Sequence, residues 1–329
     1  MKKLITLILM LSILSTALIG FTACGETADF TVGICQIAPH PALDAASQGF
    51  MDALEAELAK AGKTVKFVEQ NAGNDISTCP TIIGSFVANG YDLILANATP
   101  VLQAAKSATS TIPILGTSVT EYGVALGIEN FTGLVGTNIS GTSDLAPLDI
   151  QAQMFIDTLS LQAGDKVGLL YCSAEANSKY QVDVVGEYLE SKGIVVTNYE
   201  FADSNDLSAV CNKAASEVKA IYVPTDNTVA DNTGIINNIC LAKKVPVFAG
   251  EEGICSGCGY ATLSISYYDL GKTTGEMAAK ILLGEEDIED MRIQYAATST
   301  KKYNKATCDA LGIDTAALDA LGYVAIEND

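Results

Sequence analysis

Short apolar runs alternate with longer amphipathic segments along most of the chain. The first apolar run covers 30–37, and in the segment 41–61 that follows it Leu43, Phe50 and Leu54 stand near helical spacing. The alternation predicts repeated strand–helix units. Because the expected strands are continuously apolar, they predict parallel sheets covered by helices on both faces.

The units form two series. In the first, strands are expected at 30–37, 65–69, 91–96, 112–116 and 133–137, and helices at 41–61, 75–89 and 99–108. In the second, helices are expected at 147–161, 176–192, 206–216 and 228–243, and strands at 166–171, 194–200, 220–223, 245–249 and 260–264. Two series predict two doubly wound α/β lobes, with ligands beyond the carboxyl ends of the strands. The 306 residues from 24 to 329 agree, since they exceed the roughly 250–300 residues that one core organises.

Three elements remain after the second series: a helix at 267–283, a strand at 291–296 and a helix at 303–311. Leftover elements of this kind indicate that the chain recrosses between lobes, and we place the crossings at 141–146, 264–268 and 296–299. The N-terminal lobe is then expected to comprise 24–145 and 265–297, and the C-terminal lobe 146–264 and 298–329. Three connections between two lobes form a hinge that permits closure.

The first 23 residues have the pattern of a secretory signal. Lys2 and Lys3 precede an apolar run over 4–19, and small residues at 22 and 23 lead to Cys24. This predicts a signal peptide over 1–23 and lipidation of Cys24, which would anchor the protein to a membrane without spanning it. Phe21 stands where a leucine is usual. An uncleaved anchor and a coincidental cysteine are the alternatives.

Charge excludes some partners. Residues 24–329 contain 17 basic and 39 acidic residues, a net charge of −22. Nucleic acid and anionic lipid surfaces both need basic clusters, so neither is expected as a partner. A strongly acidic surface needs no explanation beyond solubility.

Eight cysteines follow Cys24, and most stand inside apolar runs, where cysteine usually packs as a small hydrophobic residue. Cys255 and Cys258 form a single CxxC motif. A local disulfide or two free thiols are favoured over a metal or redox site, because there is no second pair and His40 is the only histidine. We expect no metal, no cofactor and no enzyme, since no nucleophile elbow or phosphate loop is evident.

Polar residues cluster just after the expected strand ends, where they would face a cleft between the lobes. They are Gln36, His40, Asn97, Thr99, Thr117 and Ser118 in the first series, and Ser173, Glu175, Asn177, Ser178, Thr225, Asp226, Asn227, Glu251 and Glu252 in the second. Thr99, Ser178 and Thr225 could equally be helix caps. Capping does not account for an acid, an amide and a hydroxyl at successive strand ends.

Several segments resemble a family of ABC-transporter substrate-binding lipoproteins whose known members bind tryptophan, tyrosine or phenylalanine. They are Gly33–Gln36, His40–Asp44, Ala98–Pro100, Thr117–Thr120, Ser173–Ser178, Pro224–Asn227, Tyr267–Gly271 and Asn304–Ala306. The stretches 173–178 and 224–227 are the most specific. The resemblance implies the type I periplasmic-binding fold, a permease and its ATPase as partners, and a place at the outer face of the cytoplasmic membrane or in the periplasm, as a monomer. Glu121 and Tyr122 replace the family's usual Asp-Pro.

An amino acid needs an anion for its ammonium group and hydrogen-bond donors for its carboxylate. We expect Asp226 to take the ammonium, because charge-assisted hydrogen bonds in a closed cleft are strong. Thr99, Ser118, Asn177 and Ser178 would hold the carboxylate, with Gln36, His40 and Glu175 as second choices; His40 could instead be an exposed loop residue. Tyr122, Tyr267 and Tyr268 are candidates for an aromatic wall, although core packing is favoured over this role for the last two. The expected ligand-binding set is Gln36, Thr99, Thr117, Ser118, Glu175, Asn177, Ser178, Thr225, Asp226 and Asn227.

The predicted function is capture of an amino acid, aromatic by resemblance, for an ABC importer. The same fold could bind a branched-chain amino acid, a nucleoside or a sugar. A sensory module that presents its closed form to a receptor is the remaining alternative.

Overall fold

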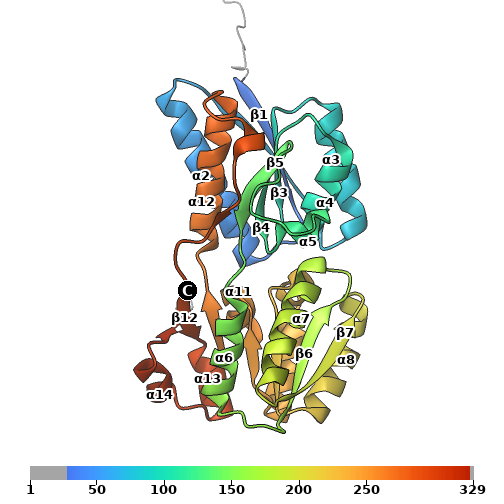
Figure 1. The fold of residues 1–329 in the computed structure, drawn as a ribbon, viewed down its shortest axis with the longest axis vertical. Helices are drawn as coiled ribbons and strands as arrows, with labels where there is room; N and C mark the ends of the chain where they lie inside the picture. Colours follow the sequence, from blue (N-terminus) through green and yellow to red (C-terminus); the bar gives the residue numbers. More distant parts are fainter. Residues whose placement is uncertain (1–27, 327–329) are drawn as a thin grey trace, which may run out of the picture.

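The computed structural model describes residues 28–326, in which two α/β lobes are stacked along the long axis of the molecule (Figure 1). The sheet of the first lobe has the strand order β11 (Gln294–Tyr295), β5 (Ile139–Ser143), β4 (Ile114–Val119), β3 (Leu93–Asn97), β1 (Phe30–Gln36) and β2 (Val65–Asn71). Its pairings are all parallel.

The sheet of the second lobe repeats this plan. Its strand order is β13 (Val324–Ala325), β12 (Thr300–Tyr303), β10 (Ala261–Ser264), β9 (Val247–Ala249), β8 (Ala220–Val223), β6 (Lys166–Cys172) and β7 (Val195–Phe201). Only the β10–β12 pairing is antiparallel among the described strands. The prediction of two doubly wound parallel-sheet lobes is therefore confirmed. In each lobe the strand order reverses beside the first strand, and ligands of such sheets bind at that point.

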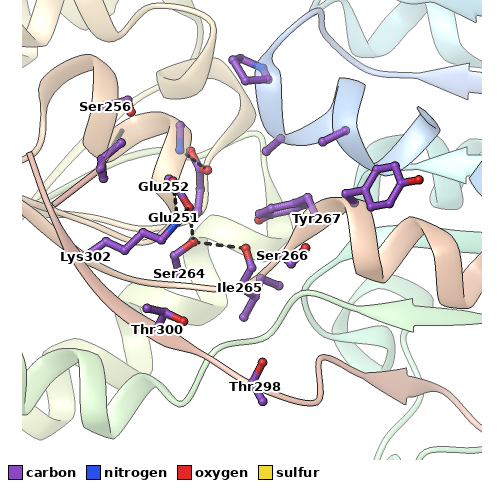
Figure 2. A pocket seen from close by; sticks show the side chains of 16 residues that line it. Glu251, Glu252, Ser256, Ser264, Ile265, Ser266, Tyr267, Thr298, Thr300 and Lys302 are labelled. Carbon is purple, nitrogen blue, oxygen red and sulfur yellow. Dashed lines mark hydrogen bonds and ion pairs between the residues drawn. The ribbon is translucent and has the colours of Figure 1, made fainter. Parts of the chain in front are cut away.

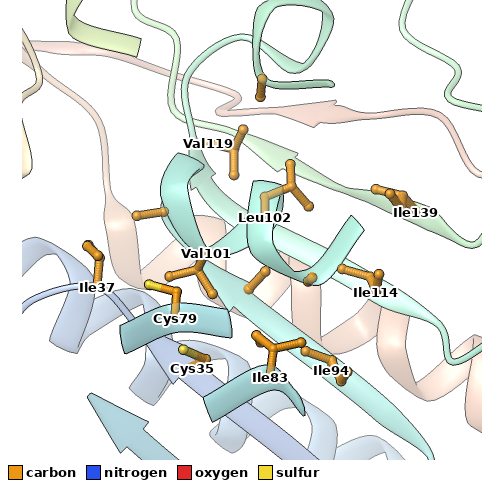
Figure 3. Packing of buried hydrophobic residues seen from close by; sticks show 14 of the residues in the cluster. Cys35, Ile37, Cys79, Ile83, Ile94, Val101, Leu102, Ile114, Val119 and Ile139 are labelled. Atoms are coloured by element: carbon orange, nitrogen blue, oxygen red, sulfur yellow. The ribbon is translucent and has the colours of Figure 1, made fainter. Parts of the chain in front are cut away.

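Helices cover both faces of each sheet, because the buried strands are apolar on both sides. In the first lobe, α2 (Pro41–Lys60) and α12 (Tyr267–Leu282) cover one face, and α3 (Cys79–Ala88), α4 (Thr99–Ala108) and α5 (Tyr122–Leu126) the other. Figure 3 shows the core between this sheet and α3, α4 and α5, where Cys35 and Cys79 pack among isoleucine and valine side chains.

In the second lobe, one core forms against α6 (Leu148–Leu159), α7 (Ala176–Ser191), α13 (Lys305–Leu311) and α14 (Thr315–Ala320). The other forms against α8 (Ser204–Glu217), α9 (Asn227–Ala230), α10 (Thr233–Lys243) and α11 (Glu252–Cys258). Cys255 and Cys258 lie on α11 as two buried free thiols, and burial raises the pKa of both. Among the described residues, no helix has both the length and the apolar character that a membrane crossing requires.

Three connections join the lobes: 144–147 between β5 and α6, 265–266 between β10 and α12, and 296–299 between β11 and β12. The lobe boundaries placed from the sequence fall within these connections and remain a proposal. The predictions for 1–23 and for Cys24 lie outside the described residues.

The predicted strand at 133–137 is wrong. Gly133 and Gly136 have φ angles of +90° and +72°, which a strand does not use, and this segment is a loop. The fifth strand is β5, at 139–143, whose polar side chains are buried and hydrogen-bonded. Thr142 Oγ1, for instance, is 2.8 Å from Thr274 Oγ1 on α12, and Ser140 Oγ donates to the Met291 carbonyl.

Two predicted helices and one predicted strand also need correction. The segment 228–243 divides into α9 and α10, because the Asn232 side chain donates to the Thr228 carbonyl at 2.8 Å and ends the first helix. The helix expected from Tyr303 begins at Lys305, since residues 300–303 form β12. The strand expected at 291–296 is reduced to β11.

Glycines allow α2 and α12 to approach closely. A Cβ atom placed on Gly271 would lie 1.9 Å from the Ala46 carbonyl oxygen, and one on Gly49 would lie 2.1 Å from that of Tyr268. These atoms belong to helix backbones, so neither can move aside. This contact fixes α12, and with it Tyr267 at its first turn, against the first lobe.

We predict that Gly271→Ala lowers the free energy of unfolding by about 1–3 kcal/mol, because the added methyl group forces the two helices apart. Gly84→Ala on α3 is the matched control, since nothing lies within 4 Å of its Cβ position. Removing an exposed helical glycine should leave stability equal or higher, by up to about 1 kcal/mol. Urea denaturation followed by circular dichroism measures both, and equal midpoints would contradict the close contact.

Candidate functional site

A small cavity lies between the lobes, at the carboxyl ends of their strands. The lining residues are His40, Leu43, Ser118 and Thr120 from the first lobe, Asp144 and Tyr267 at the hinge, and Asn177, Thr225, Asp226, Asn227, Ala230, Glu251 and Ile254 from the second lobe.

The first lobe contributes two strand ends with uncommon backbone conformations. Ser118, within β4, has a φ of +54°, and Ala98, between β3 and α4, has a φ of +99°. Residues other than glycine rarely adopt positive φ, and such positions concentrate at functional sites. His40 precedes α2 and is only 6% exposed, so it is not a solvent-exposed loop residue. Its Nε2 lies 3.5 Å from Asn227 Oδ1 and joins the two lobes.

Glu175 holds the loop before α9 in the second lobe. Its carboxylate accepts from the backbone N–H groups of Asn227 and Thr228 at 3.0 and 2.9 Å, and from their side chains at 2.6 and 2.9 Å. Both oxygens are therefore fully used within the protein. Glu175 thus fixes the loop that carries Asp226 and does not line the cavity.

Asp226 and Glu251 line the cavity, but each also caps a helix. Asp226 accepts from the backbone N–H of Val229 at 2.9 Å and of Cys172 at 2.7 Å. Glu251 accepts from Ile254 N–H, and from Gly253 N–H at 2.6 Å. Burial raises the pKa of Glu251 to about 7. Burial, and secondly the charge of Glu175, also raise the pKa of Asp226.

Asp144 stands directly after β5 and is 4% exposed. Its Oδ2 accepts from the Tyr267 hydroxyl at 2.9 Å, while its Oδ1 has no partner among the described residues. Burial raises the pKa of Asp144, and the hydroxyls of Tyr267 and Thr120 partly oppose this shift.

Buried polar atoms without a partner are concentrated in this cavity. Six such side-chain atoms occur within the described part of the chain, and four belong to residues that line it: His40 Nδ1, Ser118 Oγ, Asp144 Oδ1 and Asn177 Oδ1. Buried polar groups are nearly always hydrogen-bonded in proteins. Four exceptions around one small cavity therefore point to a polar ligand.

Five of the predicted ligand residues line the cavity and five do not. Ser118, Asn177, Thr225, Asp226 and Asn227 line it. The others are buried beside it: Gln36, Thr99, Thr117, Glu175 and Ser178.

Contacts within the protein account for these buried residues. Gln36 donates to Asp44 Oδ1 at 2.7 Å and accepts from Ser47 Oγ at 2.9 Å, and Thr117 Oγ1 accepts from Thr142 Oγ1 at 3.2 Å. A hydrogen bond from Ser178 favours the ionised form of Asp226, lowering its pKa against the larger effect of burial. These residues hold the strand ends in position.

Of the three tyrosines, only Tyr267 lines the cavity. Tyr122 is 1% exposed in the first-lobe core, where its hydroxyl donates to the Thr142 carbonyl at 3.1 Å. Tyr268 is exposed and donates to Asp52 at 2.8 Å.

Sequence reasoning missed several lining residues. Asp144 obeys the rule of a polar residue after a strand end, but the sequence predicts the fifth strand too early, at 133–137, and so does not point to it. Glu251 stands after an expected strand end but is not in the expected ligand-binding set. Leu43, Ala230 and Ile254 carry no signal that separates a cavity wall from a core.

A larger open hollow of about 1,040 Å³ lies at the hinge beside the cavity. Glu251 and Tyr267 line both spaces. Figure 2 shows these two residues on one side of the hollow, with Thr298 of the third connection and Thr300 of β12 across from them. Lys302 is paired there with Glu252 at 2.7 Å, so its charge is already balanced.

Known proteins resemble this chain over most of its length. A family model described as ABC transporter substrate binding protein matches residues 31–320. The tyrosine-binding protein of Clostridioides difficile (strain R20291) is 34% identical over 293 residues, which cover 89% of this chain and 84% of the relative.

Two solved structures are also similar. The ABC domain in complex with L-Trp from Streptococcus pneumonia has a TM-score of 0.81 at 30% identity, covering 90% of this chain and 100% of that one. The ligand-free, open structure of a substrate-binding protein with adhesive properties from Clostridium difficile has a TM-score of 0.65 at 36% identity, covering 91% and 100%. The shape of this chain is therefore nearer to the ligand complex than to the open structure.

These matches confirm the resemblance stated from the motifs, and with it the type I periplasmic-binding fold. The chain belongs to the family of ABC transporter substrate-binding proteins.

Proposed function

We propose that this extracytoplasmic protein captures an aromatic amino acid, tyrosine most directly, in the cavity between its lobes. The observation that carries the proposal is the group of four unpartnered polar atoms around that cavity. The similarity to a protein named for tyrosine binding and to a complex with L-Trp supports the same substrate class.

The charges of the cavity favour an ammonium group. Asp144, Asp226 and Glu251 line it, and no lysine or arginine is among the lining residues. Buried carboxyl groups without a nearby cation are costly, and the raised pKa of each reflects that cost. A ligand ammonium would supply the missing positive charge through charge-assisted hydrogen bonds.

The unpartnered atoms are mostly acceptors. Asn177 donates through Nδ2 to the Thr225 carbonyl at 3.0 Å, which leaves its Oδ1 as an acceptor. Asn227 donates through Nδ2 to Glu175, so the atom that it presents to His40 Nε2 is the acceptor Oδ1. Nε2 therefore carries the hydrogen of the neutral imidazole, and His40 Nδ1 is an acceptor. Asp144 Oδ1 is the third unpartnered acceptor. Tyrosine would offer the three N–H bonds of its ammonium and one phenolic O–H.

The rest of the lining suits the remainder of the ligand. Ser118 Oγ is a free hydroxyl that can donate to the ligand carboxylate. Leu43, Ala230 and Ile254 provide apolar contacts for a ring, and Tyr267 provides an aromatic one. These contacts support an aromatic side chain better than a sugar, which needs polar partners on every side.

We further propose that residues 1–23 are a signal peptide and that a lipid on Cys24 anchors the protein, as a monomer, near its permease and ATPase. The basis is the sequence pattern alone: two lysines, an apolar run and small residues before the cysteine.

We predict that calorimetry with tyrosine, tryptophan and phenylalanine gives one binding site per chain, whereas leucine, glucose and uridine bind weakly or not at all. Because the chain contains no tryptophan, indole fluorescence in a titration comes only from added tryptophan. Tight binding confined to a non-aromatic compound would contradict the proposed substrate class.

We predict that the ligand-free protein becomes less stable as pH rises from about 4.5 to 7. Glu251 has a pKa of about 7 when folded against an ordinary value of 4.5, so the folded state binds more protons in this window and loses stability as they dissociate. One group changes the free energy of unfolding by at most about 1.4 kcal/mol per pH unit. Urea denaturation at several pH values measures the slope.

Glu251→Gln should make this dependence shallower, whereas Glu55→Gln on the exposed side of α2 should leave it unchanged. A stability that rises across this window in the native sequence would contradict the buried carboxyl groups.

We predict that Cys24→Ser moves the protein from the membrane fraction to the soluble fraction of expressing cells, without changing ligand binding in the purified domain. Partition into Triton X-114 detergent reports the anchor directly. A native protein found only in the aqueous phase would argue against lipidation.

A further inference from the structure

We propose that Asp144, positioned by Tyr267, is the residue that binds the ammonium group of the captured amino acid. The inference rests on the proposed function and assigns to Asp144 a role that the sequence alone suggested for Asp226.

The argument begins with the state of the buried carboxyl groups around the cavity. Glu175 accepts hydrogen bonds from two backbone N–H groups and two side chains, so neither oxygen is available. Asp226 uses Oδ1 for Val229 N–H and Oδ2 for Cys172 N–H. Glu251 likewise uses one oxygen for Gly253 N–H and the other for Ile254 N–H.

Asp144 differs from these three acids. Its Oδ2 accepts from Tyr267, and its Oδ1 is buried, lines the cavity and lacks a partner among the described residues. A ligand that donates to this oxygen would satisfy it without displacing a helix cap. Binding at Asp226 or Glu251 would instead have to share an oxygen that already holds a backbone N–H group.

The surroundings hold Asp144 rigidly. Its own N–H donates to the Val119 carbonyl at 3.3 Å, and the preceding Ser143 donates through Oγ to the Thr120 carbonyl at 2.7 Å. The first bond ties the connection to the end of β4, and the second ties the end of β5 to the residue after β4. The carboxylate therefore has a fixed direction before any ligand arrives, which reduces the entropy lost on binding.

Tyr267 is the positioning residue. It begins α12, which packs on α2 through glycine contacts, and its hydroxyl fixes Oδ2 so that Oδ1 is left for the ligand. Asp144 lies on the first connection between the lobes, and Tyr267 directly follows the second. The ammonium would thus be bound at the hinge, while Asn177 and Thr225 approach it from the second lobe as the cleft closes.

The test compares ligands that differ only in the amino group. Tyrosine and 3-(4-hydroxyphenyl)propionate are titrated by calorimetry into the native protein and into Asp144→Asn, Tyr267→Phe and Asp226→Asn. The native protein should prefer tyrosine by about a hundredfold or more, the effect of losing one partner of a buried charged hydrogen bond. Asp144→Asn should reduce this preference to less than tenfold, and Tyr267→Phe should reduce it in part. Asp226→Asn should reduce it by less than Asp144→Asn does, because both oxygens of Asp226 already accept backbone N–H groups.

Stability separates a binding role from a structural one. Asp144→Asn should unfold at the same temperature as the native protein or higher, because it removes a buried carboxyl group and keeps an oxygen for Tyr267. Asp226→Asn should unfold at a lower temperature, since an amide has one acceptor oxygen for two backbone donors.

An undiminished tyrosine preference in Asp144→Asn overturns the inference and leaves the proposed function standing, as does a preference lost only in Asp226→Asn. If the native protein binds no aromatic amino acid, the proposed function fails and this inference with it.

Discussion

The burial of carboxyl groups where the two lobes meet is the constraint on which the rest of the site depends. Glu175, Asp226, Glu251 and Asp144 are each less than 5% exposed, and the cavity has no lysine or arginine in its lining. Burying such groups is costly unless each is hydrogen-bonded. Three of them meet this requirement by accepting backbone N–H groups at the starts of α9 and α11. These bonds fix the loops before α9 and α11, and the fourth carboxylate, Asp144, has an oxygen that remains available to a ligand.

The doubly wound topology explains why these groups meet. Parallel strands present all their carboxyl ends at one edge of a sheet, and the following helices begin there with unpaired N–H groups. Acids placed after strands are therefore natural helix caps and also natural ligand contacts. Hydrogen-bond occupancy distinguishes the two uses in this chain. Each oxygen of Asp226 and of Glu251 already accepts a backbone N–H group, whereas Asp144, which follows a strand and lies on a connection between the lobes, caps no helix.

The sequence predicted the architecture because the central strands of both lobes are apolar on both faces. Such continuous apolar runs can be recognised in a sequence whose fold is not known. The prediction failed at β5, because Ser140, Gly141 and Thr142 are polar or small and do not give the apolar pattern of a buried strand. That error concealed Asp144. Half of the predicted ligand residues do not line the cavity and instead form hydrogen bonds within the protein beside it. Gln36, for example, is bonded to Asp44 and Ser47. Which oxygen of a buried acid is already occupied depends on backbone geometry that residue order does not specify.

Asp144 and Glu251 also bear on how closure depends on a ligand. They lie on opposite sides of the cavity, one at the end of the first-lobe sheet and the other on the second lobe, and the charge of Asp144 raises the pKa of Glu251. Bringing the lobes together without a ligand therefore places like charges near each other in a medium of low dielectric. An ammonium group between them changes this repulsion into attraction on both sides. The same acids that make the empty closed form costly would then stabilise the loaded one, so closure follows capture.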